Sequence, residues 1–297
     1  MTVAGWQRFF ISGGPGADRI FAKAGFLLSS GHMEHQVIRS ESRGDLRQAV
    51  SRAVEGLGGW GRFLARGETV LLKPNFNTAD PFPGSSDREF VSIVADLCHE
   101  AGAGEVLVGD SCTYFLKTAK VMAKWGVVEL QAGRPWLKVV NFDEGKWVKK
   151  PLAAGRSLGS VSVPELLDKV DRLFLLPCLK THKLAQYTGA LKLGVGLMKP
   201  NERLPMHLRQ LQEKIAELNL AFRPDLILMD ARKCFISGGP MAGELREPGL
   251  ILASTGRIAI DIEGVKLIQS FEGNSLAGVR PEELPQIQRA LEIGIDA

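Results

Sequence analysis

The chain has 297 residues, of which 45% are hydrophobic and 24% are charged, and its net charge is +4 at pH 7. These proportions are typical of folded globular proteins, so composition excludes a fibrous or globally disordered chain. Lysines and arginines are scattered among acidic residues rather than clustered, so we expect no nucleic-acid partner.

The first 32 residues do not have the organisation of an export signal, and their apolar stretch at residues 20–28 is interrupted by Lys23 and too short to span a membrane. We interpret residues 1–32 as an N-terminal extension, and the sequence leaves open whether it belongs to the fold. Residues 33–297 are expected to form a single α/β domain. The four cysteines form no CxxC pair, which is typical of a reducing compartment, so we expect a cytoplasmic protein without a membrane partner.

Helices and buried strands alternate in the first half of the chain. Apolar residues at helical spacing follow Asp45, and Gly58 ends that helix. Residues 86–89 form a capping-box pattern, in which Ser86 and Glu89 would satisfy free amides at the start of another helix. The elements predicted for this half are a helix at 45–57, a strand at 69–72, a helix at 86–101, a strand at 105–108 and a helix at 116–125.

The second half continues the alternation. Leucine and isoleucine residues between 204 and 218 share one apolar face, which predicts a single helix that starts near Asn201. Strands alternating with helices predict an α/β fold with a mainly parallel sheet, helices on both faces and Rossmann-like layering. The further predicted elements are strands at 137–140, 161–163, 172–176, 226–229 and 250–253 and helices at 257–269 and 281–293.

Polar residues follow the four strongest predicted strands. In a parallel sheet the carboxyl ends of the strands lie at one edge, where ligands bind, so we expect these residues to converge. The four segments are Lys73 to Asn75, Asp110 to Cys112, Cys178 to His182, and Asp230 to Arg232.

The chain resembles the family known as domain of unknown function 362 over residues 37–271. The motifs that carry the resemblance are LLKPNFN at 71–77, EAGAGEVLVGDS at 100–111, LPCLKTH at 176–182, GALKLGVG at 189–196, Asp230, GGPMAG at 238–243, and the ILAS and AID segments that end at Asp261. The resemblance implies an α/β fold and a site at these motifs, but no particular activity. Many longer relatives carry a ferredoxin-like cysteine run for iron–sulfur clusters, which this chain lacks. The chain also departs from the family pattern at Cys178, where lysine is usual, and at Leu193, where an asparagine is lost.

These residues predict an enzyme that binds a small anionic ligand, a carboxylate or a phosphate. The lysines supply positive charge, and Asn75 and Thr181 supply directional hydrogen bonds. His182 is the candidate acid/base group, because its usual pKa of ~6.5 lies near neutral pH. Asp110 or Asp230 would orient it or bind a metal. We assign catalysis to His182, Asp110 and Lys180, and substrate binding to Lys73, Asn75, Ser111, Thr181, Lys192 and Asp230.

Two other interpretations stay open at this point. One is a metal-dependent or iron–sulfur-dependent redox protein, with Cys112, Cys178 and Cys234 or with Asp110, His182 and Asp230 as ligands, working with an iron–sulfur partner. The cysteines would otherwise be small buried packing residues. The other interpretation is a non-catalytic ligand-binding module. The reaction, the cofactor and the oligomeric state are not determined by the sequence.

Overall fold

A computed structural model describes residues 35–296, so the predicted extension at 1–32 lies outside the described part of the chain. Its central feature is a ten-stranded sheet with the main path β1-β12-β10-β7-β2-β3-β4, to which β8, β9 and β11 attach through β10. The strands on this path are β1 (Val37–Glu41), β2 (Thr69–Lys73), β3 (Glu105–Asp110), β4 (Leu137–Asn141), β7 (Arg172–Leu175), β10 (Leu226–Ser237) and β12 (Leu250–Ser254).

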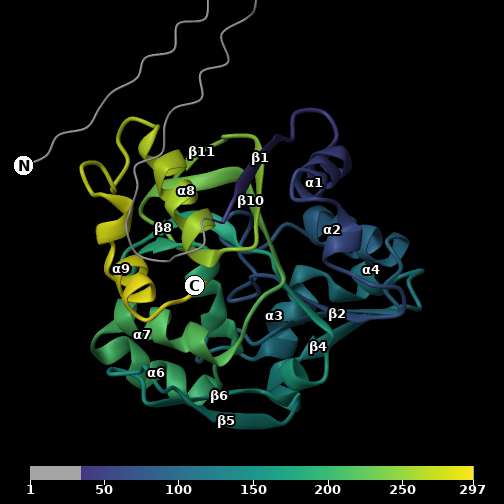
Figure 1. Cartoon of the computed structure of the whole chain (residues 1–297), viewed down its shortest axis with the longest axis horizontal. Helices are drawn as coiled ribbons and strands as arrows, with labels where there is room; N and C mark the ends of the chain where they lie inside the picture. The colour runs from purple at the N-terminus through teal and green to yellow at the C-terminus, as the bar shows by residue number, and fades with distance from the viewer. Residues whose placement is uncertain (1–34, 297) are drawn as a thin grey trace, which may run out of the picture. The chain divides into compact units, whose positions relative to one another are not determined.

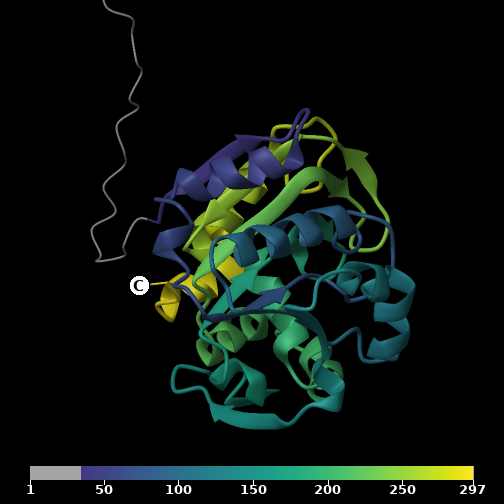
Figure 2. The same ribbon diagram turned by 90° about the vertical axis from the view of Figure 1, so that its right-hand side faces the viewer.

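The sheet is mainly parallel, as predicted. Strands β10, β7, β2, β3 and β4 pair in parallel, whereas β12 is antiparallel to both β10 and β1. The remaining strands are β8 (Cys178–His182), β9 (Gln186–Thr188) and β11 (Glu244–Arg246). Strands β5 (Trp147–Pro151) and β6 (Ser160–Pro164) form a separate antiparallel pair at the bottom of Figures 1 and 2. The strand predicted at 161–163 therefore exists, but it does not join the main sheet.

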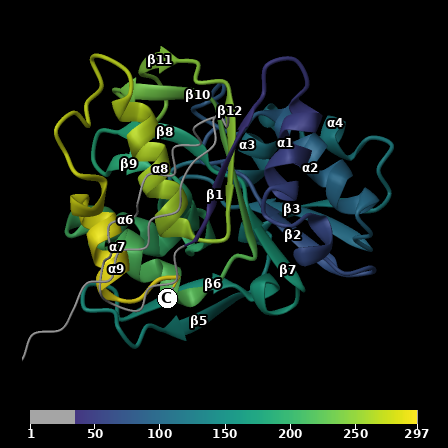
Figure 3. The same ribbon diagram turned by 45° about the horizontal axis from the view of Figure 1, so that its top comes forward.

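Helices cover both faces of the sheet. The α-helices are α1 (Leu46–Glu55), α2 (Arg88–Glu100), α3 (Thr118–Trp125), α4 (Val127–Gln131), α5 (Ala190–Leu193), α6 (Pro200–Leu208), α7 (Leu211–Leu218), α8 (Arg257–Gln269) and α9 (Pro285–Glu292). Short 3-10 turns lie at η1 (Trp60–Arg62), η2 (Phe142–Glu144), η3 (Glu165–Asp168), η4 (Gly194–Leu197), η5 (Asn219–Ala221) and η6 (Pro281–Glu283). In Figure 3, α1 and α2 lie on one side of the sheet, and α8 and α9 lie on the other.

Two apolar cores follow from the alternation of side chains along each strand. In β2, Val70 and Leu72 pack against α1 and α2, whereas Leu71 between them points into the core beneath α5, α7, α8 and α9. The same alternation holds in β7, where Phe174 belongs to the first core and Leu175 to the second. This near-continuous apolar character is what a parallel sheet covered on both faces requires.

The structure corrects three details of the predicted elements. The helix predicted from residue 201 to 218 is two helices, α6 and α7, separated at Gln210, whose φ of 53° is left-handed. Leu204 and Leu208 do not join the buried face, since 47% and 73% of their surfaces are exposed. Asp87, not Ser86, caps α2, because its carboxylate accepts the Phe90 amide.

The third correction concerns residues 178–182. They were expected to be a polar loop beyond a strand, but they form β8, which makes an antiparallel hairpin with β9. Only one residue, Pro177, separates β8 from Leu176, where the predicted strand ended. The chain thus continues in extended form beyond the edge of the parallel sheet and forms one wall of the site described next.

Candidate functional site

The candidate site lies where the strand order of the parallel sheet changes direction. From β2 the chain continues to β3 on one side, whereas β7 pairs on the other side of β2 and leads to β10. Such switch points leave a crevice beyond the carboxyl ends of the strands. A cavity of about 50 Å³ lies there, with room for about four water molecules. Its lining includes Lys73, Asn75, Asp110, Ser111, Cys178, Lys180, Thr188, Lys192 and Arg203.

The structure therefore brings together six of the predicted site residues: Lys73, Asn75, Asp110, Ser111, Lys180 and Lys192. They come from the ends of β2 and β3, from β8 and from α5, which are separate stretches of sequence. Four cationic side chains and one carboxylate line the cavity, so its charge favours an anion.

Lys73 and Asp110 form a buried ion pair at the floor of the cavity. Lys73 Nζ lies 2.8 Å from Asp110 Oδ1 and donates to the Pro74 carbonyl at 2.7 Å, and each residue is 1% exposed. Asp110 also accepts the amides of Phe76 and Ser111, each at 2.7 Å. Burial lowers the pKa of Lys73, and the Asp110 carboxylate opposes that shift. The carboxylate therefore has partners on both oxygens and fixes the end of β2 against the end of β3.

Lys180 holds the loop that follows β2. Its Nζ donates to the carbonyls of Pro83, at 3.0 Å, and Gly84. The Asn75 amide nitrogen donates to the same Gly84 carbonyl at 3.2 Å. Burial lowers the pKa of Lys180, with no carboxylate in direct contact. Lys180 and Asn75 thus form the wall of the cavity on the β2–α2 side.

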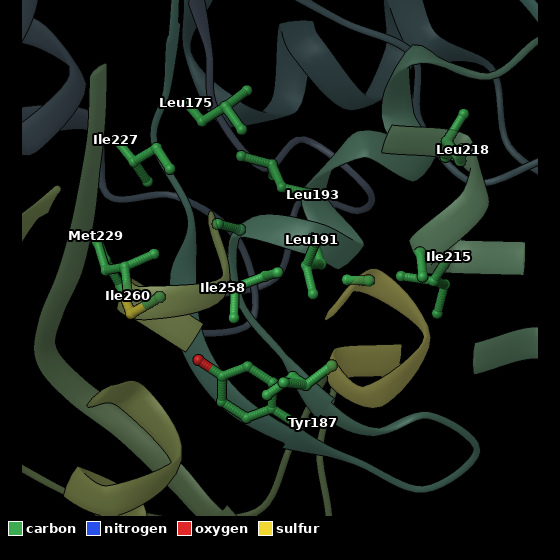
Figure 4. Packing of buried hydrophobic residues seen from close by; sticks show 14 of the residues in the cluster. Leu175, Tyr187, Leu191, Leu193, Ile215, Leu218, Ile227, Met229, Ile258 and Ile260 are labelled. Carbon is green, nitrogen blue, oxygen red and sulfur yellow. The ribbon is translucent and has the colours of Figure 1, made fainter. Parts of the chain in front are cut away.

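Lys192 is presented by the short helix α5. The Asp261 carboxylate accepts the Ala190 amide at 2.6 Å and the Leu191 amide at 3.0 Å, which anchors the start of α5 to α8. Leu191 and Leu193 on either side of Lys192 pack into the core (Figure 4). Within residues 35–296 no hydrogen-bond acceptor pairs with Lys192 Nζ. Burial, followed by the nearby Lys180 charge, lowers the pKa of Lys192 to about 8.

Arg203 of α6 is the charged residue of the cavity that the sequence did not reveal. It is 2% exposed, and its guanidinium donates to the carbonyls of Ser111, Cys112, Gly196 and Met198. All of its N–H donors are therefore directed at backbone carbonyls. Arg203 adds positive charge to the cavity but no free hydrogen-bond donor. No strand ends near residue 203, so no pattern in the sequence marked it.

His182 lies at the far end of β8 and does not line the cavity. Its Nδ1 accepts the amides of Leu184 and Ala185, each at 3.1 Å, which shapes the turn between β8 and β9. Burial, then the charges of Lys192 and Lys180, lowers the pKa of His182 to about 2. The imidazole is therefore neutral at physiological pH and is a weak base, because its ring nitrogen already accepts two amides.

Two predicted substrate contacts are placed elsewhere. Thr181 lies on the opposite face of β8 from Lys180, because successive residues of a strand alternate, and its buried hydroxyl has no partner within the described part of the chain. Asp230 does not line the cavity either. Its carboxylate is 2.8 Å from the Arg232 guanidinium, which also reaches Asp87, so Asp230 connects β10 to the start of α2.

The predicted metal-ligand sets do not assemble. No three His, Cys, Asp or Glu side chains of residues 35–296 gather as a metal-binding group. Cys112 and Cys234 belong to the two different apolar cores, on opposite faces of the sheet, and only Cys178 reaches the cavity. In the other set, Asp110 pairs with Lys73 and Asp230 with Arg232, so their carboxylates face cations of the protein. Neither of the two alternative ligand trios therefore converges within residues 35–296.

The unused hydrogen-bond donors show what the cavity can hold. A lysine has three N–H groups; Lys73 and Lys180 each direct two of them at protein oxygens, which leaves one on each. Lys192 directs none at the described residues, so three remain. Thr188, opposite Lys180 in the hairpin, adds a buried hydroxyl without a partner in the described chain. The cavity can therefore donate several charge-assisted hydrogen bonds to a small anion.

Comparison with known proteins places this site inside a family. The model of the family described as "Domain of unknown function (DUF362)" matches residues 70–266, which covers more than half of the chain and every residue that lines the cavity. A thylakoid-associated protein of the cyanobacterium Synechocystis sp. is 29% identical over 249 residues, covering 78% of this chain and 74% of that protein.

Two solved structures show more distant likeness. A Thermotoga maritima protein solved by a structural genomics consortium has a TM-score of 0.43 at 11% identity and covers 71% of this chain. The lactate racemase apoprotein from Thermoanaerobacterium thermosaccharolyticum has a TM-score of 0.41 at 14% identity and covers 70%. The chain matches 56% and 53% of the lengths of these two structures. Among its described helices, none is both long and apolar enough to cross a bilayer.

Proposed function

The chain belongs to the family described as domain of unknown function 362, and on that premise we propose that it is an enzyme that binds a small anionic substrate in the cavity at the switch point of its sheet. The observation that carries this proposal is the imbalance of charge in that cavity, where four cationic side chains face one carboxylate. The substrate would present a carboxylate or a phosphate group to these cations.

Electrostatics support an anion rather than a neutral ligand. Buried lysines lose hydration, and burial is the largest cause of the lowered pKa of Lys73, Lys180 and Lys192. An anion held between Lys73 and Lys180 would favour the charged form of these two amines and accept their free N–H groups. The volume of about 50 Å³ is sufficient for a group such as a carboxylate or a phosphate.

We assign the residues different roles from those that the sequence favoured. Lys192 contacts the substrate and is the acid/base group, because its pKa of about 8 lies near the working range of a proton-transfer group. Lys73 and Lys180 orient the anion with their remaining N–H groups. Arg203 contributes charge, and His182 keeps the β8–β9 turn in place as a neutral ring.

The test compares anion binding by two matched lysine variants. We expect Lys192→Gln to weaken binding of inorganic phosphate, measured by isothermal titration calorimetry, by about ten- to a hundredfold, because a hydrogen bond to a charged group contributes about 1.5–3 kcal/mol. Lys183→Gln removes the same charge from an exposed position in the turn between β8 and β9, and it should bind phosphate as the wild type does. Equal weakening in both variants would indicate general charge attraction and would contradict the proposal. Anion binding without turnover of any substrate would identify a non-catalytic binding module.

A further inference from the structure

Lys192 differs from the other cations of the cavity in that its amine has no partner in the described part of the chain. Lys73 is paired with Asp110, Lys180 is bound to two carbonyls, and all donors of Arg203 are directed at the backbone. Lys192 Nζ has neither a carboxylate nor an acceptor among residues 35–296. Its backbone is nevertheless fixed, because Asp261 anchors the start of α5 and both neighbouring leucines are buried. Within residues 35–296 the amine of Lys192 is therefore unpaired and lies at a defined place in the cavity wall.

The surroundings of this amine favour its neutral form. Burial and the positive charge of Lys180 lower the pKa of Lys192 to about 8, so the unprotonated fraction near neutral pH is far larger than for an ordinary lysine. A lysine beside a second cation in a desolvated pocket is a recognised arrangement for a nucleophile that attacks carbonyl carbon. The neutral amine has a lone pair, and no acidic side chain of residues 35–296 forms an ion pair with it.

The rest of the cavity matches a carboxylate next to that carbonyl. Lys73 and Lys180 each retain one free N–H, and the two together suit the two oxygens of one carboxylate group. The unpartnered hydroxyl of Thr188 lies in the same wall and can bond to a third oxygen. A cavity of about 50 Å³ has room for a small group that carries both functions.

We propose that Lys192 forms an imine with the carbonyl carbon of a small 2-oxo acid, whose carboxylate is held by the free N–H groups of Lys73 and Lys180. This inference rests on the anion-binding function proposed above and names the substrate class for that site. The lone pair of the neutral amine attacks the carbonyl carbon, and the carbonyl oxygen receives a proton that the nitrogen loses. The resulting carbinolamine then loses its hydroxyl group, which leaves as water with the second proton of the nitrogen, and a C=N bond forms. No oxidant, reductant or metal is consumed.

The experiment traps the imine in the full-length protein. The protein is incubated with glyoxylate or pyruvate and sodium cyanoborohydride, which reduces an imine to a stable secondary amine, and the product is examined by intact mass and peptide mapping. We expect one adduct per chain, located on Lys192. The rate of adduct formation should increase as the pH rises through about 8, because only the neutral amine attacks. Inorganic phosphate should slow the reaction by occupying the same cavity.

Matched variants make the result specific. Lys192→Arg keeps the positive charge but removes the nucleophile, so it should form no adduct, whereas the exposed Lys183→Arg should react like the wild type. Circular dichroism and thermal unfolding check that Lys192→Arg is folded, and peptide mapping of the wild type locates the adduct independently of any variant. Adducts spread over several lysines, or adducts retained in Lys192→Arg, would overturn the inference. Phosphate binding by the wild type without any adduct would also overturn it and leave the anion-binding proposal standing, whereas absence of phosphate binding would contradict that proposal itself.

Discussion

Replacing Asp110 with asparagine is expected to lower the free energy of unfolding by about 3–5 kcal/mol, because it breaks a buried ion pair and leaves the lysine charge uncompensated. Asp110 accepts hydrogen bonds on both oxygens, from the amides of Phe76 and Ser111, while Oδ1 also contacts Lys73 Nζ. An asparagine has one acceptor oxygen, so its NH₂ group would face another donor whichever way it is turned. Urea unfolding monitored by circular dichroism measures the loss.

A double-mutant cycle separates the ion pair from the backbone bonds. Lys73→Met should also destabilise the protein, and the combination of Lys73→Met with Asp110→Asn should cost clearly less than the sum of the two single changes. Asp168→Asn removes an acid from an exposed ion pair with Lys150 and should cost less than about 1 kcal/mol. Additive losses in the cycle, or a loss at Asp110 as small as that at Asp168, would show that the buried pair does not hold the two strand ends together.

Gly196→Ala is expected to lower the free energy of unfolding by about 1–3 kcal/mol, the usual cost of forcing extra volume into a packed region. A Cβ at residue 196 would lie 2.3 Å from Asp110 Oδ1 and 2.6 Å from Lys73 Nζ. Both side chains are buried and neither can move away without breaking the ion pair, so the turn η4 must shift outward. The glycine is thus required by close approach to the floor of the cavity. Thermal and urea unfolding measure the effect.

Gly61→Ala is the matched control for this substitution. Gly61 lies in the 3-10 turn η1, its φ is not left-handed, and an added Cβ would meet no atom within 4 Å. The free energy of unfolding of Gly61→Ala should therefore stay within about 0.5 kcal/mol of the wild-type value, the range of ordinary surface substitutions. A Gly196→Ala variant that is as stable as Gly61→Ala would mean that the turn η4 does not pack tightly against the ion pair.

Much of the fold could be predicted because its signals are local. Short apolar runs located β2, β3 and β7, and the alternation of strands with helices indicated the parallel sheet with helices on both faces. The break between α6 and α7 could not be predicted in the same way. The leucine periodicity continues across this break. The residue that separates the two helices is left-handed, but it is Gln210 and not a glycine, which would have indicated a helix end.

Part of the candidate site could also be predicted, because residues after parallel strands must lie at one edge. That argument located Lys73, Asn75, Asp110 and Lys180, and the family resemblance added Lys192. The prediction was wrong where the local backbone conformation decides whether a side chain faces the cavity. Thr181 was expected in a loop, but as part of β8 it points away from Lys180. Arg203 reaches the cavity from the helix α6, where no strand end marked it in the sequence.

The proposed function requires that an anion is held between segments that are distant in the sequence. Crystals of the protein soaked in selenate, whose selenium scatters X-rays anomalously, test this directly. We predict an anomalous peak inside the cavity, within hydrogen-bonding distance of Lys192 Nζ and close to the free N–H groups of Lys73 and Lys180. Selenate peaks found only at surface positions, with the cavity occupied by water alone, would contradict the claim that this cavity is an anion-binding site.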